Sequence, residues 1–244
     1  MSSTVLPVSE REARVPLPAR YATAWRPMFQ DAIRERLSPG ATVLDIGSGR
    51  HPSLAAAERR DARWVGLDLS EDELRRAPED AYQERVVADL SARVDSLAGS
   101  IDLAVSWQVL EHVKPLGRAL DNVYAYLKPG GQFVALFSGG FSAFAIVNRL
   151  LPDRLGHTVV SKIMRRPSDG LHPVFPAYYD RCYASALERM FAGWSHVSIE
   201  PHFRGAVYFH FSAALQRAYL AYESAAARRG LDNLATHYFV VAQK

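Results

Sequence analysis

Mostly apolar runs separated by polar segments recur along the first half of the chain. They lie at residues 42–46, 63–69, 86–90, 101–107 and 132–137, and short uninterrupted runs of this kind are typical of strands that are covered on both faces. The segments around them are predicted to be helices at 21–37, 52–60, 71–77 and 116–127. Strands that alternate with helices predict an α/β fold with a mostly parallel sheet and right-handed crossovers.

The alternation stops at residue 141 and resumes near residue 183. The segment 141–180 is rich in aromatic residues, proline and glycine, and we expect it to be an aromatic, partly helical lid insertion. Beyond it we predict helices at 183–192 and 209–229, and strands at 195–200 and 236–242. Residues 1–20 contain three prolines and are predicted to be a flexible tail, so residues 21–244 form one domain with the insertion inside it.

Composition narrows the class of protein. The 244 residues carry a net charge of +3, with basic residues scattered in pairs and not gathered in a stripe, which argues against a nucleic-acid partner. No apolar stretch approaches the ~20 residues that a membrane span requires. A single cysteine, Cys182, leaves no internal disulfide and no cysteine metal cluster. A cytoplasmic enzyme fits these features best.

The first strand opens into a glycine-containing turn. The run Val43–His51 passes through Asp45, Gly47 and Gly49, and Pro52 follows where a helix could start. Glycine lets the backbone approach a nucleotide-like ligand closely. Asp68 ends the next strand 21 residues after Gly47, near the spacing expected for an acid that binds ribose hydroxyls.

The ordered set of these motifs, with Ala88-Asp89, residues 105–112 and residues 127–133, resembles class I S-adenosylmethionine-dependent methyltransferases. The resemblance implies a Rossmann-like seven-stranded sheet whose last strand is antiparallel and lies between strands five and six. It also implies cofactor contacts from Asp45, Gly47 and Gly49 in the loop, Asp68 and Leu69 at the ribose, Asp89 and Leu90 at the adenine, and Trp107 and Gln108 closing the pocket. One departure is His51, which replaces a third glycine and stands with Arg50 either near the cofactor or only at the loop's end.

Two looser motifs, Asn148–Pro152 and Phe175–Tyr179, resemble bacterial methyltransferases associated with polysaccharides, including mycobacterial sugar O-methyltransferases of methylmannose polysaccharide synthesis. That resemblance implies a small-molecule acceptor, in the first place a sugar or oligosaccharide hydroxyl, and allows a homodimer. The many aromatic residues between 141 and 211 could stack on sugar rings or could be core for added helices.

A hydroxyl acceptor benefits from a general base or a metal. The candidate bases are His112 with its neighbour Glu111 after the fourth strand, His157 in the insertion, and His51. Mg²⁺ is conceivable, but no ligand set can be read from the spacing.

Three other functions fit the sequence less well. In a nicotinamide dehydrogenase the third glycine of the loop would fall on Pro52, and the motif of nucleic-acid amino methyltransferases is replaced by Ser106–Val109. A catalytically silent cofactor-binding scaffold would tend to lose the loop residues that this chain keeps. Within enzymes, a natural-product or lipid-linked O-, N- or C-methyltransferase stays open as the alternative.

Overall fold

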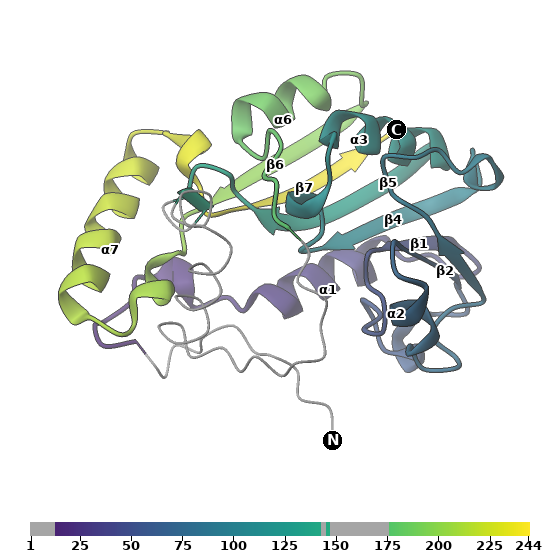
Figure 1. The fold of residues 1–244 in the computed structure, drawn as a ribbon, viewed down its shortest axis with the longest axis horizontal. Helices are drawn as coiled ribbons and strands as arrows, with labels where there is room; N and C mark the ends of the chain where they lie inside the picture. Colours follow the sequence, from purple (N-terminus) through teal and green to yellow (C-terminus); the bar gives the residue numbers. More distant parts are fainter. Residues whose placement is uncertain (1–12, 143–144, 147–175) are drawn as a thin grey trace.

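The computed structural model describes residues 13–142, 145–146 and 176–244, and Figure 1 shows their arrangement. A mixed sheet forms the centre, with strand order β3-β2-β1-β4-β5-β7-β6, in which β7 runs antiparallel to both neighbours. The strands are β1 (Thr42–Ile46), β2 (Arg63–Asp68), β3 (Glu84–Val87), β4 (Ile101–Trp107), β5 (Leu127–Ser138), β6 (His196–His202) and β7 (His237–Gln243). This is the expected seven-stranded Rossmann-like topology, with the last strand between β5 and β6.

Helices cover both faces of the sheet. α1 (Trp25–Arg36) and α2 (Glu71–Arg75) lie on one face, and α3 (Leu116–Tyr126) and α6 (Ala184–Met190) lie on the other (Figure 1). A further helix, α7 (Ala213–Arg228), stands at one end of the molecule beside the sheet. Short 3-10 turns occupy η2 (Ala19–Tyr21), η3 (Ala56–Glu58), η4 (Asp95–Leu97), η5 (Leu110–His112), η6 (Ala206–Phe209) and η7 (Asp232–Leu234).

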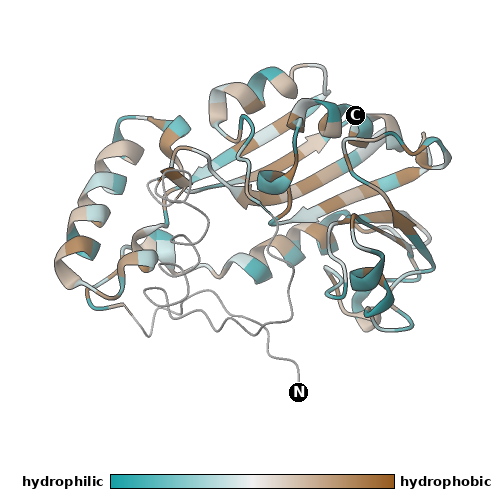
Figure 2. Ribbon diagram, viewed as in Figure 1, coloured by the Kyte–Doolittle hydropathy of each residue, from teal (hydrophilic) through white to brown (hydrophobic). Residues whose placement is uncertain are grey.

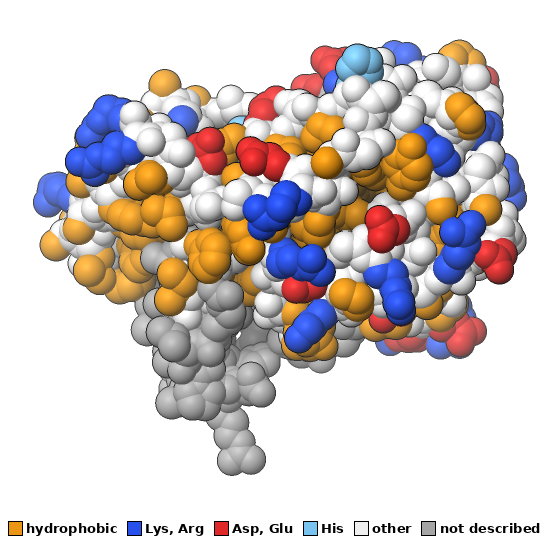
Figure 3. Space-filling model, turned by 90° about the horizontal axis from the view of Figure 1, so that it is seen from above, with side chains coloured by type: hydrophobic (Ala, Val, Ile, Leu, Met, Phe, Trp, Pro, Cys, Tyr) orange, Lys and Arg blue, Asp and Glu red, His pale blue; other side chains and the backbone are white. Residues whose placement is uncertain are grey.

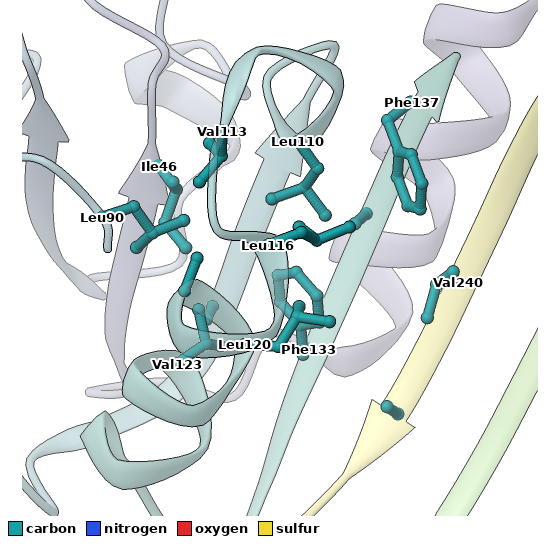
Figure 4. Packing of buried hydrophobic residues seen from close by; sticks show 14 of the residues in the cluster. Ile46, Leu90, Leu110, Val113, Leu116, Leu120, Val123, Phe133, Phe137 and Val240 are labelled. Carbon is teal, nitrogen blue, oxygen red and sulfur yellow. The ribbon is translucent and has the colours of Figure 1, made fainter. Parts of the chain in front are cut away.

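Alternation along the central strands sends side chains into two separate cores. Val43 and Val105 pack toward α1, whereas Leu44 and Ala104 pack toward α3. Figure 4 shows the second core, in which Leu116, Leu120 and Val123 of α3 meet the aromatic and aliphatic residues of the sheet. Because both faces are covered, the central strands read as continuous apolar runs, and Figure 2 shows the corresponding hydrophobic colour along them.

The helix predicted over 52–60 is wrong: only the short turn η3, Ala56–Glu58, forms there. Side chains fix this segment instead of helical backbone bonds. The buried carboxylate of Asp45 accepts hydrogen bonds from both the backbone N–H and the hydroxyl of Ser53, at 2.8 and 2.7 Å. The buried guanidinium of Arg59 donates to the carbonyls of Leu54 and Ala81. The segment is therefore held as an irregular loop.

Other boundaries shift by a few residues. The strand predicted at 86–90 is found at Glu84–Val87, so Asp89 lies beyond the strand and not inside it. Residues 13–20, expected to belong to a tail, pack against α7, where the backbone N–H of Arg14 donates to the side-chain oxygen of Gln216. Most of the predicted lid, residues 143–144 and 147–175, lies outside the described residues. Among the described helices, none is both long and apolar enough to cross a membrane.

Candidate active site

A cavity of about 420 Å³ opens at the edge where the parallel strands end. Its lining comes from the segments that follow β1, β2, β3 and β4, together with residues that precede α6 in the chain. The polar lining side chains are Asp68, Asp89, Gln108, His112, Lys114 and Tyr178, and the apolar ones include Ile46, Leu67, Leu69, Leu90, Val109 and Val113. Ligands of α/β sheets bind at this edge, so the cavity is the candidate active site.

Gly47 brings the backbone of the first loop against this cavity. Its φ is +67°, a left-handed conformation that glycine adopts without a steric penalty, and its N–H donates to the carbonyl of Leu67 at 2.6 Å. A Cβ added here would lie 2.5 Å from a methyl carbon of Val109. Position 47 therefore requires glycine for two reasons: the backbone has a positive φ, and there is no space for a Cβ.

Asp68 ends β2 inside the cavity and is almost fully buried. One carboxylate oxygen accepts a hydrogen bond from the backbone N–H of Ser70 at 2.8 Å, which fixes the orientation of the group. Burial raises the pKa of Asp68, and the nearby Glu73 raises it further. An oriented carboxylate of this kind suits the paired hydroxyls of a ribose.

An apolar slot lies next to Asp68. Leu90 follows Asp89, and its carbonyl accepts a hydrogen bond from the buried amide of Asn122 at 2.8 Å, which ties the slot to α3. Asp89 itself accepts from the backbone N–H of Ser91 at 2.8 Å. Leu69, Val109 and Val113 add apolar surface to the same lining. A flat aromatic ring with polar edges would fit between such groups.

Of the two residues proposed to close the pocket, Gln108 and Trp107, only the first lines the cavity. Gln108 lines the cavity in a left-handed conformation, with φ +56°, and its side-chain oxygen accepts from the hydroxyl of Ser138 at 3.3 Å. Trp107 does not reach the cavity. It faces α1, where its ring lies 5.1 Å from that of Phe29 and 5.1 Å from the guanidinium of Arg26. Alternation at the end of β4 explains this, since Val105 also packs toward α1.

Asp45, Gly49 and the two basic loop residues stand outside the lining. Asp45 supports the loop through Ser53, as described above. Gly49 has φ +48°, and a Cβ there would lie 3.0 Å from the Cβ of Glu73. Arg50 forms a two-bond ion pair with the carboxylate of Glu73, so its charge is directed to α2, and His51 is exposed.

Glu111 and His112 share the turn η5 but have different environments. The carboxyl of Glu111 is buried outside the lining, one oxygen accepts from the backbone N–H of Ser138 at 3.2 Å, and burial raises its pKa. His112 lines the cavity, and its Nδ1 lies 3.1 Å from the carbonyl oxygen of Pro176. A carbonyl can only accept a hydrogen bond, so Nδ1 carries the hydrogen.

Three lining residues are not assigned to the cavity by the sequence, although two of them belong to the motif Phe175–Tyr179. Lys114, Pro176 and Tyr178 form part of the wall, and the Lys114 ammonium lies 6.0 Å from the centre of the Tyr178 ring. Segment 176–179 is fastened to η5 by the His112–Pro176 bond and by the N–H of Tyr179, which donates to the carbonyl of Glu111 at 2.9 Å. No local pattern reveals such a long-range contact. Only the resemblance of Phe175–Tyr179 to known enzymes directed attention there.

Two candidates gain no support. His157 lies outside the described residues. Among the residues that the structure does describe, no group of three or more His, Cys, Asp or Glu side chains could hold a metal ion. The magnesium hypothesis therefore has no ligand set in this part of the chain.

The cavity fits the parts of S-adenosylmethionine. The close backbone approach at Gly47, the carboxylate of Asp68 and the apolar slot beside Asp89 occur in the order that loop, ribose and adenine contacts require. When bound, this cofactor supplies an electrophilic methyl group, so the protein chiefly positions the reactants.

Comparison with known proteins supports the same assignment. A methyltransferase-domain model matches residues 19–154. A mycobacterial protein named as an uncharacterized methyltransferase (Mycobacterium sp. strain KMS) is 30% identical over 120 residues, 49% of this chain and 46% of its own length. A ubiquinone biosynthesis O-methyltransferase of Xanthomonas campestris is 29% identical over 154 residues, 57% of this chain and 64% of its own length. The chain thus spans about half to two thirds of these relatives.

Solved structures share the fold. The phosphoethanolamine N-methyltransferase 2 of Haemonchus contortus, in complex with S-adenosyl-L-methionine, superposes with a TM-score of 0.55 at 18% identity, over 91% of this chain and 53% of that one. The [4+2]-cyclase SpnF superposes with a TM-score of 0.57 at 17% identity, over 95% and 85%. Since a cyclase shares the architecture, the fold alone does not define the reaction. The family match is more specific than the fold: this chain belongs to the methyltransferase-domain family.

Proposed function

We propose that the enzyme methylates a hydroxyl group of a small-molecule acceptor, in the first place a sugar or oligosaccharide hydroxyl, and that His112 is the general base. The single observation that carries this proposal is the hydrogen bond between His112 Nδ1 and the carbonyl oxygen of Pro176. Because Nδ1 holds the hydrogen, the neutral imidazole keeps its lone pair on Nε2, in a side chain that lines the cavity.

The reaction needs little else from the protein. Bound S-adenosylmethionine would supply the methyl group to the acceptor oxygen, and His112 Nε2 would accept the hydroxyl proton. Such a base contributes roughly 10²–10⁴-fold to the rate. Segment 176–179 holds the imidazole in this tautomer, which makes Pro176 a positioning residue.

The other candidate bases are weaker. Glu111 is buried outside the cavity lining, where one carboxylate oxygen accepts from the N–H of Ser138, so it does not face an acceptor in the cavity. His51 is exposed and also outside the lining. A direct role for His157 stays a prediction.

The acceptor class rests on two supports. The aromatic ring of Tyr178 and the polar groups of His112 and Lys114 meet at the same cavity wall, a combination suited to a sugar ring with hydroxyls. The likeness to a ubiquinone biosynthesis O-methyltransferase favours hydroxyl chemistry and keeps a phenolic, lipid-linked acceptor as the second candidate. Action in the cytoplasm and a homodimeric state stay predictions.

The test of the base uses two matched variants. His112→Asn keeps a donor that can reach the Pro176 carbonyl but removes the base, so we expect kcat/KM to fall roughly 10²–10⁴-fold while S-adenosylhomocysteine affinity is kept. Glu111→Gln should retain most activity, because the side chain lies outside the cavity lining. Full turnover by His112→Asn would refute the assignment. Selective loss in Glu111→Gln would transfer the role to Glu111.

The acceptor is identified with methyl-labelled cofactor and a panel of free sugars, methyl glycosides, catechols and primary amines. Label transfer to a sugar oxygen supports the first candidate. Transfer only to a catechol supports the lipid-linked alternative, and transfer only to an amine contradicts hydroxyl methylation altogether.

A further inference from the structure

We infer that helix α7 is a docking surface for the anionic face of a lipid bilayer. α7 and its flanks expose large apolar side chains: Phe211 is 39%, Leu215 49%, Tyr222 39% and Leu231 44% exposed. Leu215, Ala218 and Tyr222 are separated by three and four residues, so they share one face of the helix. An exposed apolar face of this kind is typical of a surface that binds a partner.

Ring contacts through the buried Tyr219 connect the exposed side chains of Phe211 and Tyr222. The ring of Phe211 lies 6.3 Å from that of Phe209, which lies 4.7 Å from that of Tyr219, which in turn lies 5.4 Å from that of Tyr222. The chain of rings thus connects the start of the helix to its middle. In Figure 3, hydrophobic side chains gather at the left of the molecule, the end at which α7 stands in Figure 1.

The polar side chains on the opposite, buried face of α7 form hydrogen bonds with the rest of the protein. The one acidic residue of α7, Glu223, is buried, accepts the hydroxyl hydrogen of Tyr21 and accepts the backbone N–H of Gly205 at 2.5 Å. Gln216 is also fully buried and donates to the carbonyl of Ala206 at 3.3 Å. These bonds hold the helix so that the apolar stripe stays directed outward.

The charge of the exposed residues on α7 favours an anionic bilayer as the partner. The exposed positions of α7 contain arginine but no acid: Arg217 and Arg228 are exposed on the helix, Arg229 follows it, and the first acid beyond it is Asp232. A second copy of the same surface would bring arginines against arginines. An anionic bilayer offers apolar depth for Leu215 and Tyr222 and negative headgroups for the arginines, the combination that interfacial helices use.

The topology places this surface at the same edge of the sheet as the active site. β6 runs in the same direction as β5, because β7 is antiparallel to both. The connection from the end of β6 to the start of β7, which contains α7, therefore lies at the edge of the sheet where the parallel strands end. That is also the edge that carries the cavity.

Vesicle flotation tests the inference with the full chain. We expect binding to phosphatidylcholine vesicles that contain phosphatidylglycerol, and little binding to pure phosphatidylcholine. Arg217→Ala with Arg228→Ala should weaken binding about 25-fold, since each arginine near an anionic surface contributes roughly fivefold. Leu215→Asp with Tyr222→Asp should abolish it.

Matched controls lie elsewhere on the surface. Val197→Asp on β6 and Arg189→Ala on α6 alter an exposed apolar and an exposed basic residue away from α7, and both should bind as the unmodified chain does. Each variant is shown to be folded by S-adenosylhomocysteine binding and by a cooperative thermal unfolding transition. If the double aspartate variant does not fold, Tyr222→Ser replaces it in the flotation assay.

Equal flotation of the α7 variants and the unmodified chain would overturn the inference, as would no flotation with either vesicle. A concentration-dependent dimer that Leu215→Asp disrupts, without vesicle binding, would assign the face to a second copy instead.

Discussion

Replacing Asp68 should separate the ribose contact from the rest of cofactor binding. Asp68 is 8% exposed and lines the cavity, and the N–H of Ser70, which donates to one carboxylate oxygen at 2.8 Å, fixes the orientation of the group. Loss of charge-assisted hydrogen bonds to ribose hydroxyls costs roughly 1.5–3 kcal/mol. Asp68→Ala should therefore weaken S-adenosylhomocysteine binding about 10- to 150-fold. Asp68→Asn keeps an acceptor for the N–H of Ser70, so its affinity for S-adenosylhomocysteine should lie between those of the unmodified chain and Asp68→Ala.

Calorimetry with a pair of ligands sharpens the test. The unmodified chain should bind adenosine more tightly than 2′,3′-dideoxyadenosine, and Asp68→Ala should bind the two alike, because the distinguishing hydroxyls lose their partner. Asp72→Ala is the matched control, since the Asp72 carboxylate forms ion pairs with the surface residues Arg75 and Arg76. Undiminished discrimination in Asp68→Ala would refute the ribose assignment.

Two further predictions concern the loop and the stability of the fold. Gly47→Ala places a methyl group 2.5 Å from Val109 at a left-handed φ of +67°, so cofactor affinity measured by calorimetry should fall more than tenfold while circular dichroism keeps its folded signal; unchanged affinity would contradict the close approach. His202 is mostly buried, and burial together with the Arg204 guanidinium lowers its pKa from 6.5 to about 4. The unfolded chain therefore binds the extra proton between these values, and the free energy of unfolding should fall by up to about 3 kcal/mol as pH drops from 6.5 to 4. His202→Asn should remove this slope in urea titrations, and an unchanged slope would refute it.

The strands of the sheet could be predicted because their apolar character is visible in short stretches of the sequence. Central parallel strands are covered on both faces, so Val43, Leu44 and Ile46 are apolar regardless of which neighbour they meet. Gly47 and Asp68 follow from spacing along the chain. The antiparallel position of β7 came from the resemblance, since no periodicity reveals strand order.

The rest depends on partners far apart in sequence. The segment after β1 is an irregular loop because Asp45 and Arg59 hold it, and the same residues could equally have belonged to a helix with Pro52 at its start. Trp107 faces α1 because regular alternation along β4 puts it on the same side of the sheet as Val105. The tautomer of His112 depends on Pro176, 64 residues away.

A crystal structure of the chain with S-adenosylhomocysteine would test all of the proposed cofactor contacts at once. We expect the ribose hydroxyls on the carboxylate of Asp68, the adenine between Leu90 and Val109 with its amino edge toward Asp89, and the backbone of Gly47 against the homocysteine portion. A product molecule bound outside this cavity, or a ribose without contact to Asp68, would contradict the proposed contacts.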